Sequence, residues 1–469
     1  MPALPALALL LAGALPGAPE APPNVVIVLA DDLGYGDLGV YGHPTVRTPR
    51  IDRMAAEGQR WTSFYVGESV CTPSRAALLT GRLAVRSGLS PSDEGRRVFF
   101  PDSAGGLPLS EVTIAELLKT RGYATAAIGK WHLGHLPQYL PMSQGFDEYF
   151  GIPYSNDMEM APVPGATMIG GEDPTKRARI MDPRVEYWNV PLMRGTSVIE
   201  RPADQRTITR RYTEEALRFL RASASRPFFL YLAHSMPHVP LFTSPGFAGK
   251  SRRGLYGDVI EELDWSVGQV LDTLRELKLE DRTLVLFSSD NGPWALFDEQ
   301  GGSAGPLRGA KGGTFEGGMR VPAIFRWPGT IRPGVVSELG ATLDLLPTIA
   351  ALTGAAVPAE RVLDGYDLTP VLRGQGRSPR QHVFFYRGVR LYALRQGAHK
   401  AHFFTRPEYG EGTEAAHDPP LVYDLDQDPG ERYDVASRHP EVVARIRSLA
   451  TEHARTLVPV ENQVDKRLP

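Results

Sequence analysis

The sequence predicts an α/β protein built on a mostly parallel sheet. Uncharged runs that are typical of strands buried on both faces occur at 25–29, 124–128, 228–232 and 284–287, with a shorter candidate at 323–325. Apolar residues recur at helical spacing in segments 110–121 and 258–277 between them. Strands that alternate with helices favour a parallel sheet covered by those helices.

The composition is that of an ordinary globular protein. Of the 469 residues, 42% are apolar and 22% are charged, which is enough for one large domain with a smaller one. The net charge of -3 argues against a nucleic-acid-binding surface. We therefore expect a small-molecule partner.

Residues 1–21 are expected to be a signal peptide. Segment 4–15 contains only uncharged Ala, Leu, Gly and Pro, although the usual basic start is missing, and a disordered leader is the alternative. The stretch is too short to cross a bilayer, and no other segment is apolar enough, so no membrane span is predicted.

The chain has one cysteine and no Asn-x-Ser/Thr sequon. An internal disulfide is therefore excluded, and no site for N-linked glycosylation is present. These two features predict a secreted or periplasmic enzyme of bacterial type.

Charged and polar residues follow each of the four buried runs. They are Asp31 and Asp32, then Lys130 and His132, then His234 and His238, then Asp290 and Asn291. Because ligands of open α/β sheets bind beyond the carboxyl ends of the strands, we expect these side chains to converge on one crevice.

Three carboxylates in one crevice predict a bound cation. Asp31, Asp32 and Asp290 would repel one another by about 4 kcal/mol per close pair, and Asn291 adds a neutral oxygen. An all-oxygen set favours Ca²⁺ or Mg²⁺ over zinc, and calcium suits it somewhat better. For either pair alone, ordinary turn residues are an equal alternative.

The only cysteine, Cys71, lies at the predicted start of a helix. Thr72 is a suitable N-cap and Pro73 a suitable first helical residue for the apolar stretch 76–79. Such a helix end attracts anions, and Arg75 would add positive charge. A buried inert thiol is the common alternative for a free cysteine.

The stretch Cys-Thr-Pro-Ser-Arg at 71–75, followed by Leu-Leu-Thr-Gly-Arg at 78–82, resembles the signature of type I sulfatases. Five further segments, 24–37, 129–134, 237–240, 289–292 and 309–318, resemble the family's metal loops and its catalytic Lys and His segments. Segments 151–157, 256–258 and 400–404 resemble the branch of arylsulfatase A and N-acetylgalactosamine-6-sulfatase. In this family a separate maturation enzyme oxidises the cysteine to Cα-formylglycine.

The resemblance implies a role for each matching residue. The implied metal ligands are Asp31, Asp32, Cys71, Asp290 and Asn291. The implied catalytic residues are Cys71, Arg75, Lys130, His132, His238 and Lys311. The implied substrate contacts are Lys130, Ser155, His238, Lys311 and His402. His234 does not match and is expected to be structural.

The resemblance also implies a mechanism. A hydroxyl of the hydrated formylglycine at position 71 would attack sulfur, while His238 and Lys311 stabilise or protonate the leaving oxygen. His132 would then take a proton so that sulfate leaves. A serine at this position has only one hydroxyl, so sulfate could not be released in this way.

The implied fold is an alkaline-phosphatase-like, mostly parallel mixed sheet between helices. After about residue 375, short strands at 383–386, 391–394, 400–405 and 421–424 and a helix at 440–454 predict a small antiparallel sheet with a closing helix. We expect a catalytic domain over 22–375 and a C-terminal subdomain over 376–469.

The sequence therefore predicts a sulfatase that hydrolyses sulfate monoesters of aryl alcohols, sugars or glycolipids. Its expected cofactors are Ca²⁺, with Mg²⁺ as the alternative, and formylglycine, which requires the maturation enzyme as a partner. Two alternatives stay open: a phosphomonoester or phosphodiester hydrolase of the same superfamily, and a non-catalytic binder of sulfated glycans with unmodified Cys71. Loops 158–202 and 407–419 are expected to determine the natural substrate.

Overall fold

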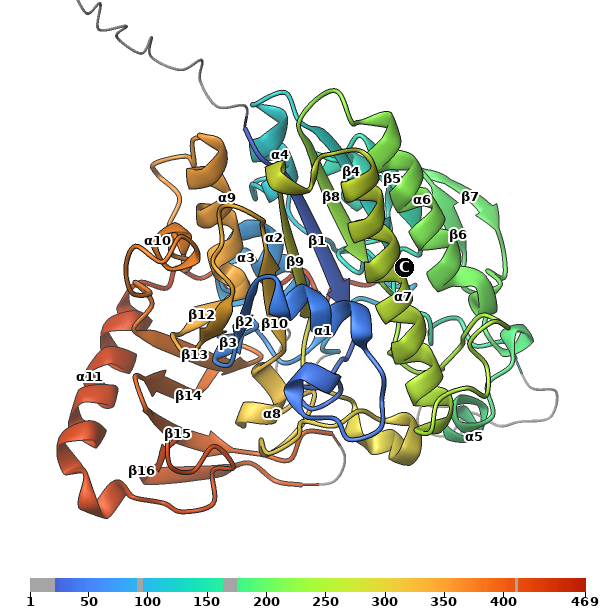
Figure 1. The fold of residues 1–469 in the computed structure, drawn as a ribbon. Helices are drawn as coiled ribbons and strands as arrows, with labels where there is room; N and C mark the ends of the chain where they lie inside the picture. Colours follow the sequence, from blue (N-terminus) through green and yellow to red (C-terminus); the bar gives the residue numbers. More distant parts are fainter. Residues whose placement is uncertain (1–21, 91–95, 163–174, 410–411) are drawn as a thin grey trace, which may run out of the picture.

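A computed structural model describes residues 22–90, 96–162, 175–409 and 412–469. The predicted signal peptide lies outside the described residues. Within them the main sheet has ten strands in the order β11-β2-β10-β9-β1-β8-β4-β5-β6-β7. Its central strands are β9 (Thr283–Ser289), β1 (Asn24–Ala30), β8 (Phe228–Ala233), β4 (Ala124–Gly129) and β5 (Glu148–Gly151), all parallel to one another (Figure 1).

The two edges of the sheet contain antiparallel strands. On one side β10 (Ala323–Arg326) runs antiparallel to β9 and to β2 (Gln59–Trp61), which pairs in parallel with β11 (Gly334–Val336). On the other side β6 (Leu192–Arg194) and β7 (Ser197–Glu200) follow β5 as antiparallel strands. The predicted mostly parallel mixed sheet is confirmed, and the fifth predicted strand is an antiparallel one.

Helices cover both faces of the sheet. On β1, Val25, Ile27 and Leu29 pack with α2 (Cys71–Thr80), α4 (Ile114–Lys119) and α9 (Leu345–Thr353). The alternate residues Val26 and Val28 pack with α1 (Pro49–Ala56), α6 (Ile208–Ala222) and α7 (Gly254–Glu276). Since neighbouring side chains of a strand point to opposite faces, an uninterrupted apolar run is what a doubly covered strand requires.

Three predicted helix starts differ from the structure, and one of them is α7, which begins at Gly254 instead of Asp258. Helix α4 begins four residues later than predicted because Thr113 and Glu116 form a capping box there. Helix α2 begins at Cys71, with Val70 as its N-cap, so the predicted cap Thr72 is wrong. The Thr72 hydroxyl instead donates to the His132 carbonyl at 2.9 Å. A local capping box thus sets the start of α4, whereas the side chain of Thr72 is used in a contact with a distant segment.

The remaining short elements connect these layers. They are β3 (Phe64–Tyr65), which pairs with β12 (Gly340–Ala341), and the helices α3 (Ala84–Ser87), α5 (Lys176–Met181), α8 (Glu316–Met319) and α10 (Thr369–Leu372). In the described part of the chain, no helix has the length and hydropathy that crossing a bilayer requires.

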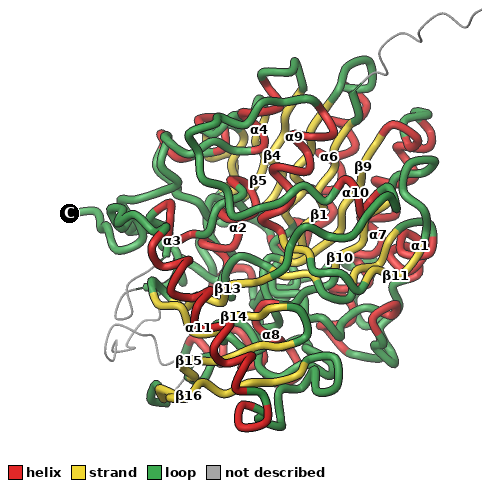
Figure 2. Tube along the Cα trace, turned by 90° about the vertical axis from the view of Figure 1, so that its left-hand side faces the viewer, coloured by secondary structure: helices red, strands yellow, loops and turns green. Residues whose placement is uncertain are grey.

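The C-terminal part forms a second, smaller sheet. Strands β13 (His382–Arg387), β14 (Arg390–Gln396), β15 (His399–Thr405) and β16 (Ala415–Asp424) are antiparallel in sequence order. Helix α11 (Pro440–Arg455) lies against this sheet (Figure 2). Its Val442 and Ile446 pack with Leu394, Ala401 and Val422 of the strands. The predicted antiparallel sheet with a closing helix is confirmed.

Candidate active site

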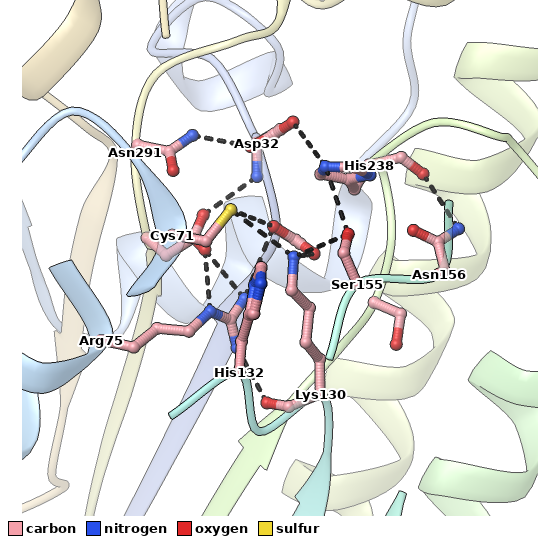
Figure 3. Close-up of polar contacts among 12 residues, drawn as sticks. Asp32, Cys71, Arg75, Lys130, His132, Ser155, Asn156, His238 and Asn291 are labelled. Atoms are coloured by element: carbon pink, nitrogen blue, oxygen red, sulfur yellow. Dashed lines mark hydrogen bonds and ion pairs between the residues drawn. The ribbon is translucent and has the colours of Figure 1, made fainter. Parts of the chain in front are cut away.

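The residues that follow β1, β4, β8 and β9 meet at the carboxyl edge of the sheet, together with the start of α2 (Figure 3). All of them are buried, with at most 3% of their surface exposed: Asp31, Asp32, Cys71, Arg75, Lys130, His132, His238, Asp290, Asn291 and Lys311. The main sheet therefore brings together residues that are up to 280 positions apart.

The carboxylates lie side by side in this cluster. The amide of Asn291 donates to Asp32 Oδ1 at 2.7 Å, and Asp290 Oδ1 accepts the backbone N–H of Asp32 at 3.1 Å. Asp32 has φ of 64°, a left-handed conformation that is uncommon for a residue other than glycine. Burial raises the pKa of Asp31 to about 7, although Lys130 opposes the shift.

Cys71 lies beside these carboxylates. Its Sγ is 3.7 Å from Asp31 Oδ1 and 3.5 Å from Lys130 Nζ. Burial raises the pKa of the thiol to about 12, so the thiolate is scarce at neutral pH. One potential ligand atom from each of Asp31, Asp32, Cys71 and His238 lies within 4.8 Å of the others.

Two lysines neutralise the carboxylates. Lys130 Nζ is 2.6 Å from Asp31 Oδ2 and 3.2 Å from Ser155 Oγ, and Lys311 Nζ is 2.8 Å from the Asp32 carboxylate. Burial lowers the pKa of both lysines, but the neighbouring carboxylates outweigh burial and leave the pKa of each raised. Both side chains are therefore ammonium ions.

Each histidine has one ring nitrogen occupied by a backbone carbonyl. His132 Nε2 donates to Phe99 O at 2.9 Å, and His132 Nδ1 is buried without a hydrogen-bond partner among the described residues. His238 Nδ1 donates to Val239 O at 2.5 Å, and its Nε2 is 3.4 Å from Ser155 Oγ. Burial lowers the pKa of both rings, and the next cause is Lys130 for His132 and Lys311 for His238, so both rings are neutral.

Two family descriptions match the chain. The sulfatase description matches residues 23–355, and the C-terminal region of aryl-sulfatase matches residues 378–468. Human arylsulfatase A is 47% identical, with 94% of this chain and 89% of the relative covered. Canine N-acetylgalactosamine-6-sulfatase is 41% identical, with 96% and 89% covered.

The chain belongs to the sulfatase family. A solved sulfatase structure, PsFucS1 from Pseudoalteromonas sp., has a TM-score of 0.80 at 29% identity and covers 94% of this chain and 92% of that one. Sulfatases hydrolyse sulfuric esters, which agrees with the predicted class of enzyme. The alkaline-phosphatase-like fold expected from the motifs is likewise confirmed.

One prediction about this sulfatase is wrong. The missing disulfide and sequons led to a secreted or periplasmic enzyme of bacterial type, whereas the curated relatives described above are human and canine proteins. Cysteine and sequon counts show which disulfides and N-linked glycans a chain can form, and they do not identify its organism or compartment.

Arg75 was expected to add positive charge for an anion at the start of α2, and in this sulfatase it contacts a carboxylate and a backbone carbonyl. Its Nε donates to Asp290 Oδ2 at 2.9 Å and its Nη1 to Lys130 O at 2.9 Å. The guanidinium is fully buried, with 0% of the side chain exposed. Arg75 therefore holds Asp290 and the Lys130 backbone in place instead of presenting a free charge to an anion.

The structure brings Ser155 into the site and leaves His402 outside it. Ser155 Oγ lies between Lys130 and His238, as the distances above show. His402 Nε2 is instead 2.7 Å from Glu431 Oε1, and its ring packs on Phe315 at 4.7 Å. His234, expected to be structural, contacts Ser266 Oγ at 3.1 Å.

Two aromatic residues of the site were not predicted. The Trp294 ring is 5.1 Å from the His238 ring, and the Lys311 ammonium lies 4.4 Å from the Trp294 centroid. Tyr409 contacts Trp294 at 5.6 Å between centroids. Trp294 follows Asn291, a predicted metal ligand, by three positions, and this short spacing indicates a place near the site. Tyr409 lies in loop 407–419, which was expected to determine the substrate, but no motif singled out this residue within the loop.

Proposed function

We propose that this sulfatase hydrolyses sulfate monoesters of aryl or sugar alcohols at the edge where β1, β4, β8 and β9 end. The observation that supports this most is the arrangement of two ammonium ions and two neutral imidazoles around Cys71 and three carboxylates. Cations attract the sulfate group, and imidazole nitrogens transfer protons at neutral pH. In this proposal residues 22–375 form the catalytic domain and 376–469 the C-terminal subdomain.

The site has the donors that a divalent cation needs. Asp31, Asp32 and Asp290 are buried together, and Asn291 Oδ1 is buried without a hydrogen-bond partner among the described contacts. These four side chains would hold Ca²⁺, with Mg²⁺ as the alternative, because both cations prefer oxygen ligands. Bound there, the cation supplies positive charge that stabilises a developing oxyanion next to Cys71.

Cys71 would serve as formylglycine, produced by a separate maturation enzyme. The raised thiol pKa argues against direct attack by a thiolate, and the Cys-Thr-Pro-Ser-Arg stretch at 71–75 matches the family's modification signature. The hydrated aldehyde would supply the hydroxyl nucleophile of covalent catalysis.

The lysines would bind the sulfate group. Lys130 pairs with Asp31 and lies 3.5 Å from Cys71 Sγ, and Lys311 pairs with the neighbouring Asp32, so a sulfate next to residue 71 would contact both ammonium ions. Ser155 Oγ, 3.2 Å from Lys130 Nζ, would donate a further hydrogen bond to the same group. Charge-assisted hydrogen bonds of this kind are among the stronger ones in proteins.

The proton-transfer roles follow from the ring nitrogens. Because His132 Nε2 donates to a carbonyl, the lone pair of the neutral ring is on Nδ1, which would accept a proton within the site. His238 Nε2 likewise carries a lone pair, so it accepts a hydrogen bond in this state. Lys311, which stays protonated, is the better donor to the leaving oxygen.

Relative rates on two substrates test the reaction. The protein should be produced together with a formylglycine-generating enzyme and assayed with 4-nitrophenyl sulfate and 4-nitrophenyl phosphate in the presence of Ca²⁺. We expect kcat/KM for the sulfate to exceed that for the phosphate by at least about a hundredfold. A preference for the phosphate would establish the alternative superfamily activity.

Mass spectrometry separates the enzyme from a non-catalytic binder. Peptides that contain residue 71 should show the aldehyde mass in active preparations, and the fraction modified should track the specific activity. An unmodified thiol in every preparation, together with retained binding of sulfated glycans, would favour the binder.

A further inference from the structure

An aromatic and arginine cluster extends outward from Lys311. Trp294 contacts both Lys311 and His238, at 4.4 Å and 5.1 Å. Lys311 and His238 are each only 3% exposed, whereas Trp294 and its neighbour Tyr409 are half-buried. The two aromatic rings therefore form the partly exposed layer next to the proton-donating side of the site, where the alcohol part of a substrate would leave.

The loop that carries Lys311 is shaped to accommodate Tyr409. Gly312 has φ of +87°, and a Cβ built on it would lie 2.7 Å from the Tyr409 ring. A side chain at 312 would therefore displace Tyr409 and strain the loop. Tyr409 in turn packs on Trp294 at 5.6 Å, so the two rings form a continuous wall beside Lys311.

Two arginines lie next to Tyr409 and Gly312. The Arg97 guanidinium lies 5.4 Å from the Tyr409 ring centroid. Arg97 Nη1 and Arg387 Nη1 both donate to the Gly312 carbonyl, at 2.9 Å and 3.2 Å, so the two cations share one acceptor. The two guanidinium groups therefore lie close together.

These arginines are incompletely neutralised. Arg97 Nη2 is 3.8 Å from Glu68 Oε1 and makes no hydrogen bond among the described residues. The other hydrogen bonds of Arg387 go to the carbonyls of Pro407 and Glu408. Burial lowers the pKa of Arg387 to about 10, and Arg97 adds to this shift, as expected for two neighbouring cations. Guanidinium groups held this way favour a carboxylate or sulfate partner.

We propose that Trp294, Tyr409, Arg97 and Arg387 form a leaving-group subsite for a ring that carries a second anionic group. The aromatic faces would stack on the ring of the substrate alcohol, and the arginines would bind its carboxylate or second sulfate. The substrate class is then a sulfate monoester within a sulfated, acidic saccharide. This inference rests on the proposed function and names the substrate class of the same site.

Competition against 4-nitrophenyl sulfate measures binding whether or not the competitor is turned over. Three competitors are compared: N-acetylgalactosamine 6-sulfate, its disaccharide with a hexuronate, and N-acetylgalactosamine 4,6-disulfate. In the unchanged enzyme we expect one or both competitors with a second anion to bind at least about tenfold more tightly than the first, the effect of about one charge-assisted hydrogen bond. The competitor that is preferred tells whether the second anion is a carboxylate or a sulfate.

Two variants test whether Arg97 and Arg387 bind the second anionic group. Among the described residues, Arg387 donates only to carbonyls, so Arg387→Gln removes a cation without leaving a carboxylate unpaired. The double variant Glu68→Gln with Arg97→Gln removes both charges of a partly buried pair. Both should lose most of the tenfold preference and keep kcat for 4-nitrophenyl sulfate within about twofold. Arg390→Gln, an exposed arginine that pairs with Glu414, is the matched control and should keep the preference.

The outcomes separate the two proposals. If the unchanged enzyme hydrolyses 4-nitrophenyl sulfate but shows no preference for either competitor, or if the preference survives in both variants, the subsite is wrong and the sulfatase function stands. If the mature enzyme hydrolyses neither 4-nitrophenyl sulfate nor any of the three competitors, the proposed function fails, and the subsite fails with it.

Discussion

Lys400 on β15 donates to Glu316 at the start of α8 with a distance of 3.0 Å between Nζ and Oε1, and both side chains are fully buried. Glu316 follows Lys311 by five positions, and its backbone N–H donates to Glu431 Oε2 at 2.7 Å. The C-terminal sheet therefore holds the end of the loop that carries one of the two lysines of the site.

Replacement of Lys400 should destabilise the protein. In Lys400→Met, Glu316 loses a partner in a fully buried position, and loss of one member of a buried ion pair costs about 3–5 kcal/mol. The free energy of unfolding in urea measures this loss. Arg390→Met, which removes an exposed partner of Glu414 on the same sheet, should change stability by less than about 1 kcal/mol. Equal losses of stability in Lys400→Met and Arg390→Met would contradict the stabilising role of the Lys400–Glu316 pair.

Glu316 should contribute to stability in a defined pH window. Burial raises its pKa, but Lys400, Arg395 and Arg320 outweigh burial and lower it from 4.5 to about 2. Because the pKa of the folded state lies below that of the unfolded state, this stabilisation is complete above about pH 4.5 and is lost as the pH falls towards 2. Its size is on the order of 3 kcal/mol.

Unfolding curves between pH 7 and pH 3 test this titration. Glu316→Gln should be less stable than the unchanged protein at pH 7, and the difference should shrink towards pH 3. Lys400 keeps Glu431 as a partner at 3.1 Å in this variant, so the fold should persist. A difference that does not vary with pH would show that Glu316 does not titrate in this window.

Replacement of Arg75 by lysine should impair turnover strongly. Lysine cannot reach Asp290 and the Lys130 carbonyl at the same time, as the planar guanidinium does. We expect kcat to fall by at least about a hundredfold, since small displacements of catalytic groups cost that much. Arg82→Lys, in which a partly exposed arginine pairs with Glu111, is the control and should retain activity.

Replacement of Cys71 by serine should limit the enzyme to one turnover. A serine hydroxyl could accept the sulfate group but has no second hydroxyl whose deprotonation expels it. Intact-protein mass spectrometry after incubation with 4-nitrophenyl sulfate should show either no change or a single added sulfate. Multiple turnovers by this variant would falsify the proposed mechanism.

Added calcium should stabilise the folded protein. A ligand that binds only the folded state adds about 2.7 kcal/mol at a concentration of one hundred times its Kd. The thermal midpoint after chelation should rise with added Ca²⁺, and less with Mg²⁺. Asn291→Ala, which removes the unpartnered amide oxygen, should weaken this response. An equal midpoint with and without either cation would contradict the site.

Much of the fold was predictable because buried strands have a simple pattern. The runs 25–29, 124–128, 228–232 and 284–287 all proved to be strands of the parallel centre of the sheet. The edges were harder to predict, since β6 and β7 are short and partly exposed and lack an apolar run. The start of α2 depended on what Thr72 contacts elsewhere, which local propensity does not report.

The sequence by itself determined the chemical types at the site. Aspartates, lysines and histidines follow the buried strands, the cysteine lies in a sulfatase-like stretch, and a parallel sheet must bring such strand ends together. Only the tertiary structure decided how each side chain is used. It shows that Arg75 holds Asp290, that His402 pairs with Glu431, and that Trp294 and Tyr409 lie next to Lys311. The reason is that burial and partners set the pKa and orientation of a side chain, and these partners come from segments far away in the chain.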